Sequence, residues 1–455
     1  MKFRIVFLAT MLACGSAYGI NVRDALVSAY QNNQELLSTR QSVLAMHEKI
    51  VQAKGGFRPK IDAQASRTIS KSKTDRGANS TMYSGLDKNR SGSISVSQNL
   101  FKGFSDMATV SKTKHEIMSY WAQLKDKEQD TFLKVIRAYL DLYAKYASVE
   151  VYKANLTFMQ KSHEAAKIKR ETGEETITQE SLAEAKYVEA QSKLQLGIAE
   201  LEAAKAMFEQ LTGLTAPEQV DHPKELLEIP ESMEMLQEIA LRENPKIKQA
   251  AEDISSAKQN KRAITGQLLP SLDLKASTSQ SFNTNKTDTQ NIDVTTRPTE
   301  NQRNDQVGLT LSVPLYDAGV TRSQRREAKE NVVARRINFE KVRQDIIQNC
   351  KQAYRTFIAI KSNMENSSKQ VRAQEIAVNG VNQEMQAGTK ILVDVLNAQA
   401  QLLQAKLDQI NTIQQYYFYL YQMLSLQGKL TAEGLQLPVE IFRPEENYED
   451  IKNHI

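Results

Sequence analysis

Two long stretches of the chain carry hydrophobic residues at alternating steps of three and four, the pattern of a helix that packs in a coiled coil. Neither glycine nor proline occurs in residues 104–172 or in residues 320–379. At a rise of ~1.5 Å per residue, each stretch predicts one helix of ~65 to 70 residues, on the order of 100 Å long. The two hydrophobic series are Phe132, Val135, Tyr139, Leu142 and Tyr146, and then Ile347, Cys350, Tyr354 and Phe357, with a break at Lys361.

Each long stretch ends at a glycine, Gly173 or Gly388, and a second helical pattern follows within a turn. Glycine after a helical pattern is typical of a helix end, so the two positions predict helix–turn–helix tips. The same hydrophobic spacing continues from Tyr187 to Leu211 and from Leu402 to Leu426. We interpret the aromatic residues of these series as core filling between paired helices.

Four other segments, about 60–70, 93–102, 270–282 and 306–316, alternate apolar residues with small polar ones. In the last, Leu309, Leu311 and Val313 alternate with Thr310 and Ser312. A period of two over about ten residues fits a membrane barrel strand with one face on lipid and one on an aqueous lumen. A soluble sheet with one face on a core has the same pattern. Segments 71–92 and 283–305 are polar and are expected to be exposed loops.

The second half of the chain repeats the first. Pro59 corresponds to Pro270 at an offset of 270 − 59 = 211, and from Ser97 to Gly213 the offset is 215 without a gap. We therefore predict a first repeat at 20–213, a connector at 214–230, a second repeat at 231–428 and a tail at 429–455 that packs beside the helices. Each repeat contains a helix, two strands, a long helix, a tip and a return helix.

Four strands cannot close a barrel, and unpaired strand edges are not tolerated in lipid. If these strands span a membrane, several subunits must therefore share one barrel, and three would pool twelve strands and twelve helices. The expected fold class is mainly α with membrane β. With three subunits, the duplicated unit would form a trimeric 12-stranded β-barrel continuous with a 12-helix α-barrel of coiled coils.

Residues 1–19 have the features of a signal peptide: basic Lys2 and Arg4, an apolar run, and small residues Ala17 and Gly19 around a cleavage site. Lipidation of Cys14 is an alternative. After cleavage only Cys350 remains, so no intrachain disulfide is expected.

The rest of the composition excludes several classes of function. The five histidines have no metal-ligand spacing, and no nucleophile elbow, phosphate-binding loop or dinucleotide fingerprint occurs. We expect no catalytic residue, no metal and no cofactor, and hence no enzyme. The formal net charge of +5 is spread along the chain without a basic patch interleaved with aromatics, which argues against nucleic acid as a partner.

Three stretches carry a resemblance to a known family: residues 95–103, residues 311–319, and the sequence Ala-Gly-Thr-Lys-Ile-Leu-Val-Asp-Val-Leu-Asn-Ala at 387–398. With the duplication, they resemble the TolC family of trimeric outer-membrane channels over nearly all of the mature chain. The resemblance implies a passive exit duct in the outer membrane that extends into the periplasm. Its cargo would be small molecules in efflux, proteins in type I secretion, or both. A periplasmic adaptor and an inner-membrane pump, either an ABC or a proton-driven one, would open it, and the sequence identifies neither these partners nor the cargo.

The resemblance also implies a gate where the tip helices close the periplasmic entrance. Asp394 would form the ring of carboxylates, and Asn397 stands where a second aspartate is usual. Without the family, Asp394 is an ordinary charge in the first turn of a helix. One carboxylate ring in place of two should bind cations more weakly.

The remaining site residues follow from the same resemblance. Lys390 would tie the inner hairpin to its neighbour through Thr178 and Gln179, but the neutral Gln179 cannot form a salt bridge, and Met385 replaces the usual tyrosine of the latch. The tips that contact the adaptor would include Gly173, Gly388 and Thr389, and the aromatics at the membrane interface would be Phe101 and Tyr316. The competing function is a soluble periplasmic coiled-coil adaptor or scaffold, which the duplicated strand pairs disfavour.

Overall fold

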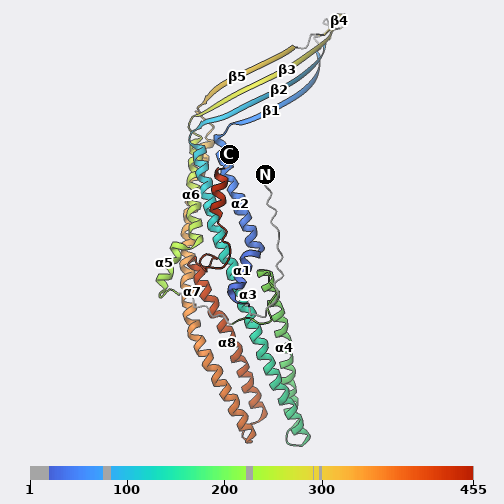
Figure 1. The fold of residues 1–455 in the computed structure, drawn as a ribbon, viewed down its shortest axis with the longest axis vertical. Helices are drawn as coiled ribbons and strands as arrows, with labels where there is room; N and C mark the ends of the chain where they lie inside the picture. The colour runs from blue at the N-terminus through green and yellow to red at the C-terminus, as the bar shows by residue number, and fades with distance from the viewer. Residues whose placement is uncertain (1–19, 75–82, 222–228, 290–291, 297–299, 454–455) are drawn as a thin grey trace. The chain divides into compact units, whose positions relative to one another are not determined.

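The structure, a computed structural model, describes residues 20–74, 83–221, 229–289, 292–296 and 300–453 (Figure 1). The expected signal peptide therefore lies outside the described residues. The fold is mainly helical, and the order of elements occurs twice. The first set is α1 Val22–Asn32, α2 Gln34–Lys54, a 3-10 turn at Gly55–Phe57, β1 Lys60–Thr74, β2 Tyr83–Lys102, α3 Ser105–Glu171 and α4 Ile177–Thr212. The second set is α5 Met233–Glu243, α6 Pro245–Gly266, β3 Ser271–Thr289, β4 Ile292–Thr296, β5 Glu300–Ser312, α7 Val320–Gln386 and α8 Leu392–Leu426, followed by α9 Pro444–Asn453.

The prediction of two very long helices is confirmed, since α3 and α7 each contain 67 residues. Their regularity follows from the sequence, because neither helix contains a proline and glycine occurs only once, at Gly380 near the end of α7. Within the described residues, none of the helices combines the length and the hydrophobicity that a transmembrane helix requires.

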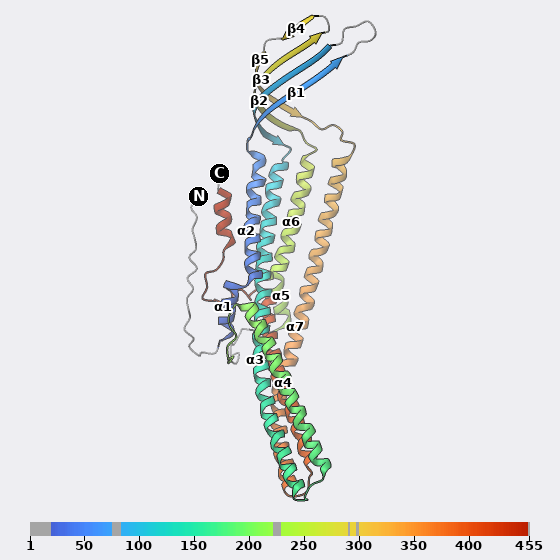
Figure 2. The same cartoon turned by 90° about the vertical axis from the view of Figure 1, so that its right-hand side faces the viewer.

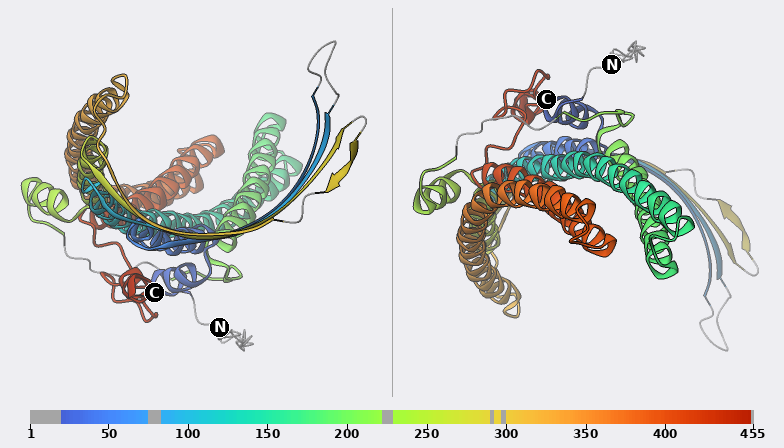
Figure 3. Two further views of the ribbon diagram at one scale, coloured as in Figure 1. Left: turned by 90° about the horizontal axis from the view of Figure 1, so that it is seen from above. Right: turned by 90° about the horizontal axis from the view of Figure 1, so that it is seen from below.

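The chain divides into two compact units. The first, which we call the hairpin unit, comprises Met1–Gln41, Gln123–Ile247 and Arg343–Phe442. Here α7, α8, α3 and α4 follow one another in a curved row, as two helical hairpins side by side (Figures 1 and 3). The predicted seam is the core of this unit, where the buried side chains include Phe132, Val135, Tyr139, Leu142, Cys350 and Phe357.

The first helix of each repeat is broken in two, which the sequence pattern did not predict. At the break, Asn33 accepts hydrogen bonds from the N–H groups of Glu35 (3.1 Å) and Leu36 (3.2 Å), and its amide donates to Leu211 O (3.0 Å). Asn244 makes the equivalent bond to Leu426 O, at 3.1 Å. In both repeats one asparagine therefore starts a helix and satisfies a carbonyl at the end of the return helix.

The second unit, which we call the sheet unit, comprises Ser42–Ala122, Lys248–Val342 and Arg443–Ile455. Its strands form one antiparallel, curved sheet in which β1 pairs with β2, β2 with β3, and β3 with both β4 and β5 (Figures 2 and 3). Because β4 and β5 follow one another along the same side of β3, they occupy the place of one strand. The register places Ile61 opposite Val96, Val96 opposite Ala276, and Ala276 opposite Val307.

The strands differ in length from the prediction. β1 extends to Thr74, β2 begins at Tyr83 and β3 extends to Thr289, so much of the two expected loops is strand. Polar residues occupy both faces there, which removes the hydropathy signal, while backbone pairing continues in register because it does not depend on side chains. β5 ends at Ser312 instead of near 316, because Pro314 has no N–H for the ladder.

The C-terminal tail packs on the sheet unit through a buried histidine. The indole Nε1 of Trp121 donates to Nε2 of His47 (2.8 Å), and Nδ1 of His47 lies 2.8 Å from Oδ1 of Asn447 in α9. Since an indole N–H can only donate, Nε2 is the acceptor and Nδ1 carries the proton. His47 therefore connects α2, α3 and α9.

Two glycines meet at the junction of β2 and α3. A Cβ on Gly103 would lie 2.1 Å from the carbonyl oxygen of Gly266, and a Cβ on Gly266 would lie 2.4 Å from that of Gly103. Gly103 also has a φ of 56°, a left-handed conformation that other residues rarely adopt. The two backbones are in direct contact, and no side chain fits between them.

Candidate functional site

Both hairpin tips turn on a glycine. At the first tip, Gly173 has a φ of 81°, its N–H donates to Arg170 O (3.0 Å), and the N–H of Glu174 donates to Lys169 O (2.8 Å). At the second tip, Gly388 has a φ of 80° and the same two bonds form, from Gly388 to Met385 O (3.0 Å) and from Thr389 to Glu384 O (2.9 Å). Each tip is a Schellman motif, which satisfies the last carbonyls of α3 and α7.

The helices that leave the two tips are capped in different ways. At α4 the hydroxyl of Thr176 accepts from the N–H of Gln179, at 3.4 Å. At α8 the cap residue is Ile391, which has no polar side chain, and the carboxylate of Asp394 accepts from the Ile391 N–H at 3.3 Å. In the single chain, Asp394 thus acts as a capping carboxylate at the positive end of α8.

Asp394 and Asn397 lie on the side of α8 that faces away from the other helices. Leu392, Val395 and Leu396 are buried, and successive helical residues are rotated by about 100°, which places Asp394 and Asn397 on the opposite side. Asp394 is half-buried and Asn397 is exposed. The predicted gate residues therefore share one polar face, which is available to other chains or to solvent.

An apolar cluster joins the two hairpins just above the tips. Leu392 and Leu396 of α8 pack there with buried residues of the other hairpin, and Met385 of α7 packs against the cluster. The residues from the other hairpin are Met159, Ala166, Ala183 and Ala190. The methionine at the latch position thus contributes packing, whereas a tyrosine would add a hydroxyl.

The other expected latch residues are not brought together within one chain. Lys390 and Thr178 are exposed, and Gln179 is half-buried. Among the described residues, no hydrogen bond or ion pair joins Lys390 to Thr178 or Gln179. The latch stays a prediction about contacts between neighbouring subunits.

The structure adds two ion pairs at the first tip that the sequence analysis did not include. Arg170 pairs with Glu180 across the turn, and Lys169 pairs with Glu175 at 3.5 Å. The other carboxylate oxygen of Glu175 is buried and has no partner among the described residues. The sequence carried a signal for these ion pairs, because the residues before Gly173 include basic side chains and the residues after it include acidic ones. At the second tip the position equivalent to Glu175 is Lys390, since 390 − 175 = 215, so the two tips carry opposite charges there.

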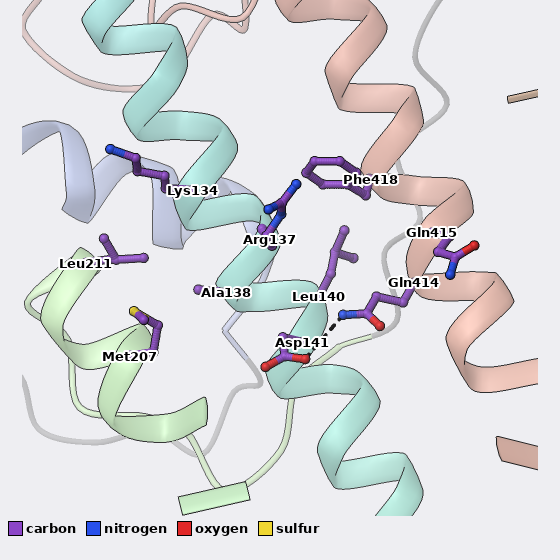
Figure 4. Close-up of a pocket in the computed structure, with 10 residues that line it drawn as sticks. All are labelled: Lys134, Arg137, Ala138, Leu140, Asp141, Met207, Leu211, Gln414, Gln415 and Phe418. Carbon is purple, nitrogen blue, oxygen red and sulfur yellow. Dashed lines mark hydrogen bonds between the residues drawn. The ribbon is translucent and has the colours of Figure 1, made fainter. Parts of the chain in front are cut away.

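Higher in the hairpin unit, a hollow lies between α3, α4 and α8 (Figure 4). The guanidinium of Arg137 lies 4.3 Å from the centre of the Phe418 ring, and Gln414 donates to Asp141 at 3.3 Å. Met207 and Leu211 of α4 line the other side. These contacts hold helices of the two hairpins together, and they contain no arrangement of nucleophile, acid and base.

Of the expected interface aromatics in the sheet unit, Phe101 lies at the end of β2 and Tyr316 lies beyond the end of β5 at Ser312. Phe101 is half-exposed and packs edge-on against Phe104, with ring centroids 5.1 Å apart. Tyr316 is 83% exposed. Neither residue has its large ring buried within the chain, and their contact with a membrane interface stays a prediction.

The described side chains that could bind a metal or act as a nucleophile are dispersed. Across the part of the chain that the structure describes, no group of three or more histidine, cysteine, aspartate or glutamate side chains is arranged to hold a metal ion. Cys350 is buried, and its burial raises the pKa of the thiol to about 11. The thiol is therefore unreactive at neutral pH.

Comparison with known proteins identifies the class of the chain. The sequence profile described as "Outer membrane efflux protein" matches residues 25–214 and 236–428. The outer membrane efflux protein BepC of Brucella suis is 27% identical over 451 residues, which cover 99% of this chain and 94% of BepC. The outer membrane protein TolC of Escherichia coli K12 is 23% identical over 91% of this chain and 83% of TolC.

A solved structure, the CmeC outer membrane channel of Campylobacter jejuni, has the same fold. It superposes with a TM-score of 0.76 at 15% identity, over 95% of this chain and 89% of CmeC. At this identity the likeness is evidence for the fold alone. The family profile, by contrast, covers both repeats. The chain belongs to the outer membrane efflux protein family, whose members are transport channels of the outer membrane and not enzymes.

Proposed function

We propose that three copies of the chain assemble into one passive exit duct, with a shared barrel of twelve strands in the outer membrane and a tube of twelve helices in the periplasm. The observation that carries this proposal is the sheet. One of its faces is apolar over the half that contains Ile61, Val96, Ala276 and Val307. Its outer strands, β1 on one side and β4 with β5 on the other, each have an edge without a partner in the described chain. Such edges are not tolerated in lipid, so they require neighbouring copies.

The hairpin unit supports the same arrangement. α4 and α7 lie at the two ends of the curved row of helices, and each exposes large apolar side chains (Figure 3). Because the two ends are different surfaces, they suit a head-to-tail contact that closes into a ring after a few copies. These side chains are Ile177, Val188, Leu196 and Met207 on α4, and Ile358 and Ile376 on the part of α7 that belongs to the hairpin unit.

Assembly is tested by native mass spectrometry of the full chain extracted in mild detergent. We expect a trimer that separates with the outer-membrane fraction and requires detergent for extraction. A stable monomer or dimer would contradict the shared barrel, and a protein that stays in the aqueous phase would contradict the membrane location.

The cargo would be small molecules in efflux, secreted proteins of the type I pathway, or both, because a passive duct leaves selection to its partners. We propose a periplasmic adaptor and an inner-membrane pump, ABC or proton-driven, as these partners. The adaptor would contact the tips at Gly173, Gly388 and Thr389, where the Schellman turns present backbone without bulky side chains. The alternative of a soluble adaptor does not fit the two tandem hairpins and the family to which the chain belongs.

We further propose that the gate lies at the start of α8. The shared polar face of Asp394 and Asn397 supports this, since three copies around an axis would place three carboxylates in one narrow ring. The latch would join Lys390 of one hairpin to Thr178 and Gln179 of a neighbouring hairpin, with the lysine ammonium donating hydrogen bonds to neutral side-chain oxygens. The packing of Met385 in the apolar cluster would replace a polar contact.

Single-channel recording in planar bilayers tests the gate. We expect cation preference and block by multivalent cations added from the periplasmic side, and Asp394→Asn should reduce both while changing the resting conductance only modestly. Asp408→Asn, which removes another carboxylate of α8 farther from the tip, is the control and should retain the block. If Asp394→Asn retained full cation block, Asp394 would act only as a helix cap, and the proposed gate would be wrong.

A further inference from the structure

The apolar face of the sheet also carries a group of basic side chains. The register of β1 and β2 pairs Arg67 with Arg90, Ile69 with Lys88, and Lys71 with Leu86. Directly paired residues of antiparallel strands project from the same face, and residues two apart on one strand do so as well. Arg67, Lys71, Lys88 and Arg90, which we call the basic collar, therefore share the face of Ile61, Ala63, Ile94 and Val96.

No ion pair among the described residues neutralises the collar. None of its four residues forms an ion pair with a described residue. On this face the acidic side chain that the structure describes is Asp305, which already binds Arg303 (3.0 Å) and the hydroxyl of Thr278 (2.6 Å). The register places four other carboxylates on the opposite face: Asp62, Asp87, Asp273 and Glu300.

The pairing of Arg67 with Arg90 is unfavourable without an anion. Two like charges directly opposite one another destabilise a strand pair. Both side chains are exposed, so an anion from outside the chain can reach them. Two adjacent guanidinium groups are well suited to a phosphate, because each can form a bidentate pair with its oxygens.

The position of the collar along the strands matches the edge of a membrane. Leu272 of β3 lies opposite Phe101, and Phe282 lies opposite Arg90, a separation of 282 − 272 = 10 residues. At a rise of ~3.3 Å this is ~33 Å along the strand, and a strand tilt of about 40° reduces it to a height of ~25 Å. The apolar band of a membrane barrel is about 25 Å tall. On β1 and β2 the apolar and small residues of this face continue to Ala65 and Gly92, and the collar follows directly, whereas on β5 the charged pair of Arg303 and Asp305 already lies lower on the same face. On β1 and β2 the collar thus begins where the hydrocarbon would end.

A hollow adjoins the collar on the sheet. Its lining includes Ala65, Gly92 and Phe282, together with three collar residues, Arg67, Lys88 and Arg90. The space above Gly92 is open, since a Cβ there would have no atom within 4 Å. A bulky group can therefore lie on the small and aromatic residues while its phosphate contacts the arginines.

We propose that the basic collar binds the phosphate groups of phosphorylated lipids in the outer leaflet of the outer membrane. The proposal rests on the proposed function, which places the apolar face against lipid and the helices in the periplasm. Binding would neutralise the paired arginines and hold the barrel at a fixed depth.

The test uses the full chain, purified in a neutral detergent, and two probes: diphosphorylated lipid A, and the same lipid with both phosphates removed. Native mass spectrometry measures binding to the assembled protein. We expect at least tenfold tighter binding of the phosphorylated probe. Arg67→Gln combined with Arg90→Gln should abolish that preference, and Arg67→Lys with Arg90→Lys should retain part of it. Lys275→Gln is the matched control, because Lys275 lies on the opposite face, and it should bind as the wild type does.

Equal binding of the two probes by the wild type would overturn the proposal, as would an undiminished preference in the Arg67→Gln, Arg90→Gln variant. The lysine variant distinguishes loss of charge from loss of folding, because it keeps the charge. A detergent-extracted trimer without phosphate preference would overturn the collar alone. A protein that needs no detergent would contradict the proposed function, and the collar proposal would fail with it.

Discussion

Substitution of Leu311 by arginine tests which face of the sheet meets lipid. Leu311 is 64% exposed and lies opposite Leu272, on the face that also carries Leu309. Thr310, the preceding residue, lies opposite Asp273 on the other face. The two positions are adjacent on one strand and so lie at nearly the same depth in the membrane. A difference in assembly between Leu311→Arg and Thr310→Arg therefore depends on which face of the sheet carries the arginine.

The magnitude follows from the place of Leu311 along its strand. Leu311 is the second-last residue of β5, and it lies opposite Leu272, which is itself opposite the expected interface aromatic Phe101. An arginine on the lipid face costs ~2 to 4 kcal/mol at the bilayer midplane but only ~0 to 1 kcal/mol near an interface, so three copies in a trimer cost up to ~3 kcal/mol here. Leu311→Arg should therefore lower the amount of assembled trimer measurably without abolishing it.

The assay compares the two variants expressed at equal levels. Trimer in the detergent-extracted outer-membrane fraction is quantified, and urea unfolding in lipid vesicles gives the free-energy difference. Thr310→Arg should assemble normally and change single-channel conductance, because its side chain would enter the lumen. Equal assembly of the two variants would refute the assignment of the faces, and a loss confined to Thr310→Arg would reverse it.

Four further predictions follow from the described contacts. Gly103→Ala should lower the free energy of unfolding by about 2 kcal/mol or more, because its Cβ would overlap Gly266 O at a left-handed φ, whereas Gly55→Ala, which meets nothing within 4 Å, should be close to neutral in the same denaturant titration. Hydrogen bonds from Lys127 and then Lys134 lower the pKa of Glu35 in the folded protein. The contacts of Glu35 with the two lysines should therefore stabilise the fold at neutral pH and lose this effect as the pH falls through the lowered pKa of Glu35. Glu35→Gln should narrow the difference in melting temperature between neutral and acidic pH, and an unchanged difference would contradict the prediction. Because Cys350 is buried, it should resist a maleimide in the folded protein and react fully in urea. Rapid labelling of the native trimer would contradict this and show that the hydrophobic seam around Cys350 is exposed to solvent. Gly388→Val should strain the second tip and abolish export while trimers persist, whereas Gly380→Val, in α7 without positive φ, should export normally.

The long helices could be predicted from the sequence because their signal is local. The absence of glycine and proline over some sixty residues leaves the backbone no reason to turn, and the buried seam from Phe132 to Leu142 has the spacing of a packed helix. The strands were harder, because Ser70 and Asp87 lie beyond the point where apolar residues alternate, yet they are still paired in the ladder. The helix breaks at Asn33 and Asn244 were also missed, since an asparagine cap in a helical pattern is only a weak signal.

Much of the candidate site depends on contacts that a linear sequence does not show. Arg67 and Arg90 are 23 residues apart, and only the register of β1 and β2 places them side by side, although the charges look evenly spread along the sequence. At the tip, Asp394 was expected as a gate residue, and the single chain shows it first as the cap of α8. Its second role needs neighbouring subunits, which a single chain does not contain.

The pairing of β2 with β3 joins the two repeats, and it determines the order in which a subunit folds. β1–β2 and β3–β5 are local hairpins, whereas the closest β2–β3 partners, Lys102 and Ser271, are separated by 271 − 102 = 169 residues. Closing so long a loop is slow compared with hairpin formation. A chain that is exported from its amino end leaves one edge of β2 open until β3 arrives, and an open strand edge pairs readily with another chain. The pairing of β2 with β3 is therefore expected to be the slow step of subunit folding. Before it forms, the open edge of β2 can pair with a strand of another half-folded subunit, which is the misfolding that this topology favours.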